Sequence, residues 1–301
     1  MPLIESRARL TTLMANETLS RLERLRLNTL RRFTNKSRGE HLAGKGGRSI
    51  DFSDYRDYVP GDDVRFVDWN IFSRLNRPYL KLYHQEEEMH VLILLDASTS
   101  MRYEEKFLRA RELAAAFGVM GLLQGERVSV YAFHRRGEAP WRFPPSVGRA
   151  NMRKLFAFLE GLESRGEATL DAAVDAALRH HFGRGVAVLL SDFLTAGDLQ
   201  RACNRLFSNG LEIFALQILG PTEIDPEVTG DLRLVDSEIQ STLDISGAGE
   251  LVEIYQDYRQ AHERRVATLC RRRGGRFLSV SSATPLAELL FDQLQRRGWI
   301  R

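Results

Sequence analysis

The stretch HVLILLDASTSM, His90 to Met101, decides the fold. Five apolar residues, Val91 to Leu95, run without a break into Asp96, and the hydroxyl residues Ser98 and Ser100 follow at alternate positions. An unbroken apolar run of this length is typical of a strand that is buried on both faces of a parallel sheet. The oxygen-bearing side chains behind it predict that this strand ends at a functional edge.

Strands and helices are expected to alternate over the rest of the chain. Apolar, β-branched runs predict strands at residues 91–95, 127–133, 186–191, 211–219 and 276–281. Helical periodicity predicts helices at residues 104–123, 149–162, 170–181, 199–207, 251–272 and 285–296. This alternation predicts an α/β protein with a doubly wound, mostly parallel sheet, preceded by an N-terminal helical and short β module.

Composition indicates an ordinary soluble protein of one large or two modest domains, with 301 residues, 43% apolar and 28% charged. The longest uncharged apolar run, residues 113–123, has eleven residues, whereas a membrane span needs about 18 or more. No signal peptide is expected at the N-terminus. Cys203 and Cys270 lack C-x-x-C spacing, so neither a disulfide framework nor a zinc site is predicted. We therefore expect a cytoplasmic protein.

The N-terminal arm, residues 1–48, is basic, with eleven Lys or Arg against four Glu. Asn16 is the expected N-cap of an amphipathic helix that runs to Phe33, and residues 34–49 are expected to form a mobile loop. The GKGGRS in that loop lacks the residue order of a phosphate-binding loop. Such an arm can bind nucleic acid or anionic lipid. We favour a helix that packs on its own domain, because aromatic residues for base stacking are nearly absent.

An aromatic and acidic segment follows at residues 49–88. Asp62 or Asp63 is expected to cap a short helix through Trp69, and residues 79–83 alternate like a strand. The favoured interpretation is a compact module whose aromatic residues form its core and whose Asp and Arg residues pair with one another. A partner-binding face is the alternative. The expected core residues are Tyr55, Tyr58, Trp69 and Tyr83.

Two further oxygen-bearing residues are expected at the edge where Asp96, Ser98 and Ser100 lie. Asp192 follows the apolar run VAVLLS, and Thr169 begins the helix before that run. Because ligands of open parallel sheets bind at the carboxyl ends of the strands, these five residues should converge. Carboxylates and hydroxyls are hard donors that suit Mg²⁺ or Mn²⁺. The alternative is that these side chains only cap the helices that follow them.

This pattern resembles the metal-ion-dependent adhesion site of von Willebrand factor A domains, and the resemblance covers residues 89–284. It implies a von Willebrand A or Rossmann-like sheet. The upstream GRSIDFSDYRDYVPGDDVRFVDWNIFSR, followed by RPYLKLYHQEEE, is similar to the bacterial domain-of-unknown-function 58 family, in which such a module leads into an A domain. The chain then divides into an arm at residues 1–48, an aromatic module at 49–88 and an A-like domain at 89–301.

The resemblance implies an association with a MoxR-type AAA+ ATPase, and together with the oxygen-bearing residues it leads us to expect a non-catalytic, metal-dependent adaptor. By the same resemblance, Ser98, Ser100 and Thr169 would bind the ion directly or nearly so, and Asp96 and Asp192 would act through water or at one remove. Two carboxylates only neutralise a divalent ion, so an open coordination position can accept an acidic side chain from a protein partner. The ion would then bridge the two proteins.

A metal-dependent hydrolase of the phosphatase type is the main alternative. Haloacid-dehalogenase phosphatases also place Asp after a buried strand, but they need a second acid two residues later, where this chain has Ser98. His134 follows a strand, and His180 and His181 end a helix, so no nucleophile, base and orienting group can be assembled. We therefore predict that the protein is not an enzyme.

Overall fold

The computed structural model describes residues 9–29, 34–37, 50–86, 89–194, 197–226, 232–235, 242–245 and 248–301. The chain divides into two compact units. Unit 1 combines residues 1–30 with residues 89–301, and unit 2 consists of residues 31–88. Each unit is described separately below.

Unit 1 contains a six-stranded sheet in the order β11-β8-β7-β4-β5-β6. All neighbouring strands are parallel except β5 and β6, so the predicted mixed α/β fold with a mostly parallel sheet is confirmed. The strands are β4 (His90–Asp96), β5 (Arg127–Phe133), β6 (Trp141–Ser146), β7 (Gly185–Ser191), β8 (Leu211–Leu219) and β11 (Arg276–Ser281). The five strands expected from apolar runs all form within a residue or two of their predicted bounds.

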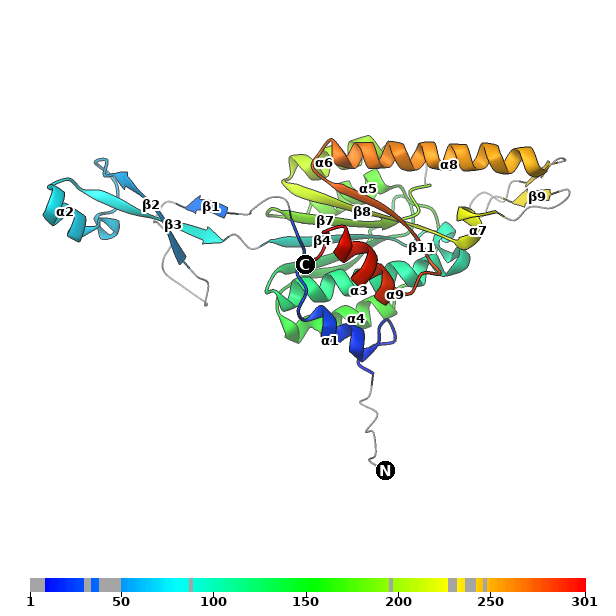
Figure 1. Cartoon of the computed structure of the whole chain (residues 1–301), viewed down its shortest axis with the longest axis horizontal. Helices are drawn as coiled ribbons and strands as arrows, with labels where there is room; N and C mark the ends of the chain where they lie inside the picture. Colours follow the sequence, from blue (N-terminus) through cyan, green and yellow to red (C-terminus); the bar gives the residue numbers. More distant parts are fainter. Residues whose placement is uncertain are drawn as a thin grey trace, which may run out of the picture. The chain divides into compact units, whose positions relative to one another are not determined.

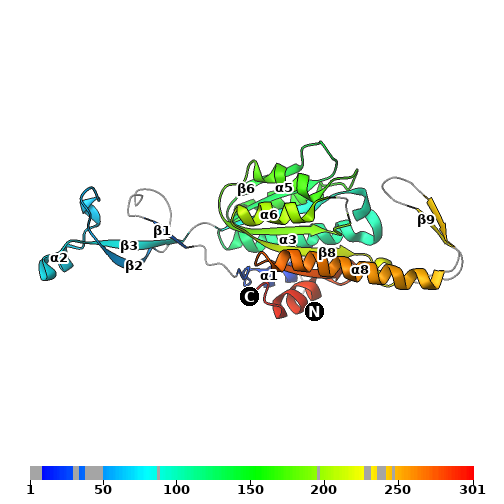
Figure 2. The same ribbon diagram turned by 90° about the horizontal axis from the view of Figure 1, so that it is seen from above.

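Helices cover both faces of this sheet (Figure 1 and Figure 2). One face carries α1 (Asn16–Leu22), α3 (Lys106–Leu123), α4 (Met152–Glu160) and α9 (Leu286–Glu288), and the other carries α5 (Leu170–Leu178), α6 (Leu199–Ser208) and α8 (Ala248–Arg271). Shorter turns are η2 (Thr99–Glu105), η3 (Arg149–Asn151), α7 (Pro221–Ile224) and the π-helix η4 (Leu289–Leu294). The expected helices therefore form, several of them split at their ends.

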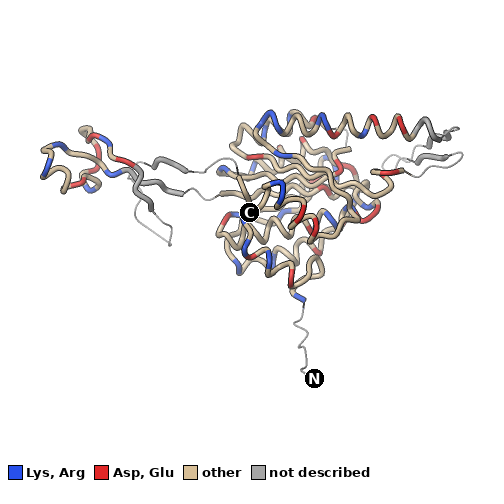
Figure 3. The backbone as a smooth tube through the Cα atoms, in the orientation of Figure 1, with Lys and Arg blue, Asp and Glu red and all other residues tan. Residues whose placement is uncertain are grey.

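The central strands explain why two helical layers are needed. Successive side chains of a strand point to opposite faces. In β4, Val91, Ile93 and Leu95 enter the core under α3, whereas Leu92 and Leu94 enter the core under α5 and α6. Charged residues lie mostly outside the central strands (Figure 3). Asp96 is the exception in β4, and it is fully buried.

The sequence patterns that predicted the other five strands did not predict β6, an antiparallel strand at the edge of the sheet. Its sequence, WRFPPS, contains two consecutive prolines, which cannot donate hydrogen bonds to a sheet. β6 pairs only with β5 in the described sheet, and an edge strand tolerates proline because one side of it needs no partner.

The sequence also did not predict β9 (Leu232–Val235) and β10 (Thr242–Ile245), which form a separate antiparallel pair.

The expected N-terminal helix is shorter than its apolar periodicity suggested. α1 begins at Asn16 with Ala15 in the N-cap position, and it ends at Leu22. The chain then extends, and Leu27 forms an isolated bridge with Ile300. Leu22 and Leu25 are buried in the core of unit 1. The favoured interpretation, a helix that packs on its own domain, is therefore confirmed for α1, whereas Leu25 and Leu27 pack on the same core from the extended segment that follows.

Unit 2 contains a three-stranded antiparallel sheet in the order β1-β3-β2. Its elements are β1 (Thr34–Ser37), β2 (Ile50–Asp57), η1 (Val64–Phe66), α2 (Trp69–Leu75) and β3 (Tyr79–Glu86). β1 shows that the expectation of a loop was wrong for residues 34–37, and residues 38–49, with GKGGRS, lie outside the described residues. Asp63 caps η1 and Asp68 caps α2, so the predicted helix is two short ones.

The prediction that Trp69 and Tyr55 are core residues was wrong. Trp69 is 60% exposed and Tyr55 is 40% exposed, and Tyr58 is half-buried. The side chain of Tyr83 lies outside the described residues. Trp69 contacts Phe72 edge-on, at 5.8 Å between ring centroids, on the surface of α2. The expected acid–base pairs do form, for example between Arg56 and Asp62 at 2.8 Å.

This exposure predicts a small effect for Trp69→Ala. Because the indole loses little contact with water on folding, the substitution should lower the free energy of unfolding by less than about 1 kcal/mol, well below the 3 to 5 kcal/mol of a buried Trp. Urea denaturation followed by circular dichroism measures the difference. A loss above about 2 kcal/mol would show that the side chain is covered in solution.

Among the described residues, none of the helices combines the length and the hydrophobicity that crossing a bilayer requires. Cys203 on α6 and Cys270 on α8 are both free and buried.

Candidate metal site at the sheet edge

The candidate site lies at the point in the sheet where the order of the strands reverses. From β4 the chain adds β5 and β6 on one side, and it then crosses back to add β7 on the other side of β4. Such a switch point is where ligands bind in open α/β sheets. β4 and β7 are paired from His90 opposite Gly185 to Leu95 opposite Leu190. The next residues along the two strands, Asp96 and Ser191, and then Asp192, therefore meet at one edge.

Asp96 is held by two hydrogen bonds in a fully buried position. Its Oδ1 accepts the backbone N–H of Ser98 at 2.9 Å, and its Oδ2 accepts the hydroxyl of Ser191 at 2.6 Å. Burial, together with the neighbouring Asp192 carboxylate, raises the pKa of Asp96 to about 7 in spite of these hydrogen bonds. A buried carboxyl group whose ionisation is opposed by burial and by a second carboxylate is an arrangement that a cation would stabilise.

The hydroxyls of Ser98 and Ser100 lie 3.0 Å apart. This is a hydrogen-bonding distance, and it is also about the separation of two adjacent ligands at ~2.1 Å from an octahedral Mg²⁺. Ser98 occupies the N-cap position of η2, but its side chain makes no capping hydrogen bond. The capping explanation is therefore wrong for its hydroxyl.

Thr169 is carried to the same edge by a loop that is tied to the end of β4. The N–H of Arg165 donates to the carbonyl of Ala97 at 2.7 Å, and the N–H of Thr99 donates to the carbonyl of Gly166 at 2.8 Å. Thr169 occupies the N-cap position of α5 without a side-chain capping bond. The structure thus brings the loop of Thr169 against the loop that carries Ser98.

Asp192 does not cap α6 either, since Asp198 fills that role by accepting the N–H of Arg201. One oxygen of Asp192, Oδ1, accepts the N–H of Leu194 at 3.1 Å. The other, Oδ2, accepts from the ammonium of Lys106 at 3.0 Å. Both carboxylate oxygens are therefore already engaged by the protein.

Lys106 and Glu223 are components of this edge that the sequence did not reveal. The Lys106 side chain is 1% exposed, and its Nζ lies 3.0 Å from Asp192 Oδ2 and 2.8 Å from Glu223 Oε1. Burial alone would lower the pKa of Lys106, but the charges of Asp192 and Glu223 outweigh burial and raise that pKa. The available signal in the sequence was a lysine in the first turn of the apolar helix KFLRARELAAAFGVMGLL.

Three non-glycine residues at this edge have left-handed backbone conformations. Phe193, directly after Asp192, has φ 57°, and Glu104 and Glu105 have φ 43° and 57°. The Glu104 carboxylate accepts the N–H of Thr222 at 3.0 Å, which fastens the loop after β4 to the loop after β8. Such strained residues cost about 1 to 3 kcal/mol each and gather at functional sites.

The charge of the group around Lys106 suits one divalent cation, whereas the Glu104 carboxylate is engaged separately by Thr222. In this group Asp96, Asp192 and Glu223 contribute three negative charges when ionised, and Lys106 contributes one positive charge, which leaves a balance of about −2. Within the described ranges, no three His, Cys, Asp or Glu side chains are grouped closely enough to hold a metal by themselves. A metal at this edge therefore depends on the hydroxyls of the two serines and Thr169.

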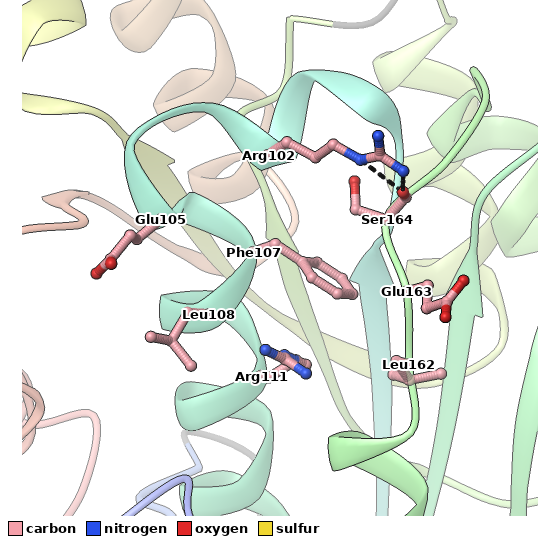
Figure 4. A pocket seen from close by; sticks show the side chains of 8 residues that line it. All are labelled: Arg102, Glu105, Phe107, Leu108, Arg111, Leu162, Glu163 and Ser164. Atoms are coloured by element: carbon pink, nitrogen blue, oxygen red, sulfur yellow. Dashed lines mark hydrogen bonds between the residues drawn. The ribbon is translucent and has the colours of Figure 1, made fainter.

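A pocket of about 370 Å³ adjoins the edge (Figure 4). The guanidinium of Arg102 donates to the carbonyl of Ser164 at 2.8 Å, and the hydroxyl of Ser164 donates to the carbonyl of Ser98. The pocket is lined by Arg102, Glu105, Phe107, Leu108, Arg111, Leu162, Glu163 and Ser164. It combines apolar walls with both signs of charge.

Fold and edge together define an α/β protein with a parallel sheet and a buried acid and hydroxyl cluster at its switch point. The family described as "Protein of unknown function DUF58" matches residues 54–267, and the chain belongs to this family. The uncharacterized protein Rv1480 of Mycobacterium tuberculosis is 28% identical over 284 residues, which cover 92% of this chain and 89% of that protein. The uncharacterized protein Mb1516 of Mycobacterium bovis matches to the same extent.

Two solved structures are similar to this chain, and each match covers 70% of this chain and 98% of the other chain. The conserved hypothetical protein BatB from Bacteroides thetaiotaomicron is 14% identical, with a TM-score of 0.43. An aerotolerance-related membrane protein from Bacteroides fragilis is 17% identical, with a TM-score of 0.44.

Proposed function

We propose that unit 1 is a von Willebrand factor A-like domain whose edge binds Mg²⁺ or Mn²⁺ and, through the ion, an acidic residue of a protein partner. One observation carries the proposal. Two fully buried carboxyl groups, Asp96 and Asp192, are neighbours, and burial together with the charge of Asp192 raises the pKa of Asp96, beside two serine hydroxyls 3.0 Å apart. A hard divalent cation relieves this repulsion and matches these oxygen donors.

The hydroxyls of Ser98, Ser100 and Thr169 would hold the ion, because those of Ser98 and Thr169 make no capping hydrogen bond and that of Ser100 lies 3.0 Å from that of Ser98. Asp96 and Asp192 would contact the ion mainly indirectly, through water or through another group, since all their carboxylate oxygens already accept hydrogen bonds from protein groups. When bound, the ion supplies a positive centre with an open position for a partner carboxylate. Neutral direct ligands would leave most of the charge of the ion available for that carboxylate.

Binding rather than catalysis is supported by the groups around the edge. Ser98 stands where a phosphatase of the haloacid-dehalogenase type needs its second acid. Exposed apolar and aromatic residues lie on the neighbouring elements, including Tyr103 after Ser100 and Leu194 after Asp192. On α8, the hydroxyl of Tyr255 donates to the carbonyl of Glu223, and Tyr258 is 78% exposed. Exposed aromatics around a polar centre favour a protein interface.

Metal binding is expected to stabilise the protein measurably. If the Kd were about 0.1 mM, 1 mM Mg²⁺ would raise the free energy of unfolding by roughly 1.4 kcal/mol. Thermal melts in MgCl₂ and in EDTA measure the shift. Ser98→Ala should abolish it with the fold retained, whereas the control Ser208→Ala, an exposed serine at the end of α6, should keep it. An equal shift in Ser98→Ala would exclude this edge as the metal site.

The proposed partner is a MoxR-type AAA+ ATPase, which the family resemblance suggests. Association should require Mg²⁺, disappear in EDTA, and be lost in Ser98→Ala and Thr169→Ala, since each change removes a hydroxyl and little packing. Pull-down of the purified pair across these conditions measures this. Binding that ignores both chelator and substitution would place recognition elsewhere, for example on the exposed face of α2.

A further inference from the structure

Lys106 is an unusual residue for its position. Its side chain is among the largest that are fully buried in the protein, and it lies at the first position of α3. The N-terminus of a helix carries partial positive charge, and a cation there is disfavoured. Burial of an ammonium also costs free energy unless it is paired. A methionine could fill the same volume without either cost.

The contacts of Lys106 show what its charge does. Its ammonium bridges Asp192, which follows β7, and Glu223, which follows β8. Glu223 is itself fixed, because its second oxygen accepts the N–H of Gly220 at 2.7 Å. The ammonium therefore neutralises one of the three carboxylates at the edge, and it lies within 3.0 Å of a carboxylate oxygen that a metal ion would also attract.

We propose that Lys106 is an internal counter-ion of the metal edge, which competes with the divalent cation for Asp192 and holds the affinity of the edge for metal low. This inference rests on the proposed metal binding. With Lys106 present, the group of Asp96, Asp192, Glu223 and Lys106 is about neutral when the edge is loaded with a divalent ion. Without Lys106, the loaded edge would keep a negative charge and would repel the carboxylate of a partner. Lys106 thus lowers metal affinity and keeps the loaded edge receptive to an acid.

The charge assignment predicts an ordered series of metal affinities. Lys106→Met makes the edge more negative and should tighten Mn²⁺ binding at least about tenfold. Glu223→Gln makes the edge less negative and should weaken Mn²⁺ binding by a similar factor. The double variant restores the original balance and should return close to the wild-type Kd. Lys106→Arg, which keeps the charge, should bind Mn²⁺ no more tightly than wild type.

Titration of the purified full chain with Mn²⁺ measures these affinities, because the electron paramagnetic resonance signal of free aqueous Mn²⁺ reports the unbound ion. Circular dichroism and cooperative thermal melting establish that each variant is folded. If Lys106→Met does not fold, the opposite shifts of Glu223→Gln and of a milder Lys106→Gln variant test the same charge rule.

The outcomes separate the two proposals. If Lys106→Met binds Mn²⁺ with the wild-type affinity or more weakly, the counter-ion role is overturned and the metal site still stands. Replacement of a lysine with a purely structural role would only weaken Mn²⁺ binding. Absence of Mn²⁺ binding in wild type and in every variant would overturn both proposals. Binding that appears only when Lys106 is removed would support the counter-ion role most directly.

Discussion

Metal-free Asp96→Asn protein is expected to be more stable than wild type at pH 8, by roughly 2 to 4 kcal/mol, and about equally stable at pH 4. The folded state raises the pKa of Asp96 from 3.8 to about 7. The folded protein therefore binds the carboxyl proton of Asp96 more tightly than the unfolded chain does. The resulting stabilisation is fully present below pH 3.8, and it is lost as the pH rises toward and through 7.

Asparagine keeps the shape of the side chain and cannot ionise. Its amide oxygen can accept the N–H of Ser98, and its amide group can donate to the hydroxyl of Ser191, so little packing changes. Urea denaturation in EDTA at several pH values between 4 and 8 gives the two stability curves, which should diverge as the pH rises. Mg²⁺ should narrow the difference at pH 8 by stabilising wild type, and it should leave Asp96→Asn unaffected.

An exposed carboxyl provides the control for Asp96→Asn. Asp257→Asn on α8 should follow the wild-type pH profile and keep the response to Mg²⁺. If the profiles of wild type and Asp96→Asn ran parallel from pH 4 to pH 8, burial and the Asp192 carboxylate would not raise the pKa of Asp96, and the basis for the metal site would be lost.

Gly185→Ala is expected to destabilise the protein by at least about 3 kcal/mol. A Cβ on Gly185 would lie 1.9 Å from the carbonyl oxygen and 2.6 Å from the backbone nitrogen of His90 in β4. Backbone atoms cannot turn away as a side chain does, so β4 and β7 would have to separate where their pairing begins. Because this pairing sets Asp96 beside Asp192, any folded fraction should also lose its response to Mg²⁺.

Gly125→Ala is the matched control for Gly185→Ala. Gly125 has φ +74° and nothing within 4 Å of an added Cβ, so its substitution strains only the local backbone. The cost should be about 1 to 2 kcal/mol, without an effect on metal binding. Chemical denaturation of both variants measures the contrast. Equal losses would mean that β7 can shift to accommodate the methyl group.

Much of the sheet could be predicted because its signals are local. An unbroken apolar run such as Val91 to Leu95 can bury all its side chains only when helices cover both faces of the sheet. Each such run forms a parallel strand. β6 and the true end of α1 could not be predicted in the same way. Prolines were tolerated because β6 is an edge strand, and Leu25 and Leu27 are buried within an extended segment in which Leu27 pairs with Ile300.

By itself the sequence determined the layered α/β fold, and it placed Asp96 at the end of a strand and Ser98, Ser100, Thr169 and Asp192 in the adjoining segments, because period and residue type are properties of short segments. Only the tertiary structure decided which distant groups meet. Lys106 and Glu223 are 117 residues apart, and nothing local to either residue encodes their ion pair with Asp192. The exposure of Trp69 was decided in the same way, because burial depends on which layers the complete fold supplies around a side chain.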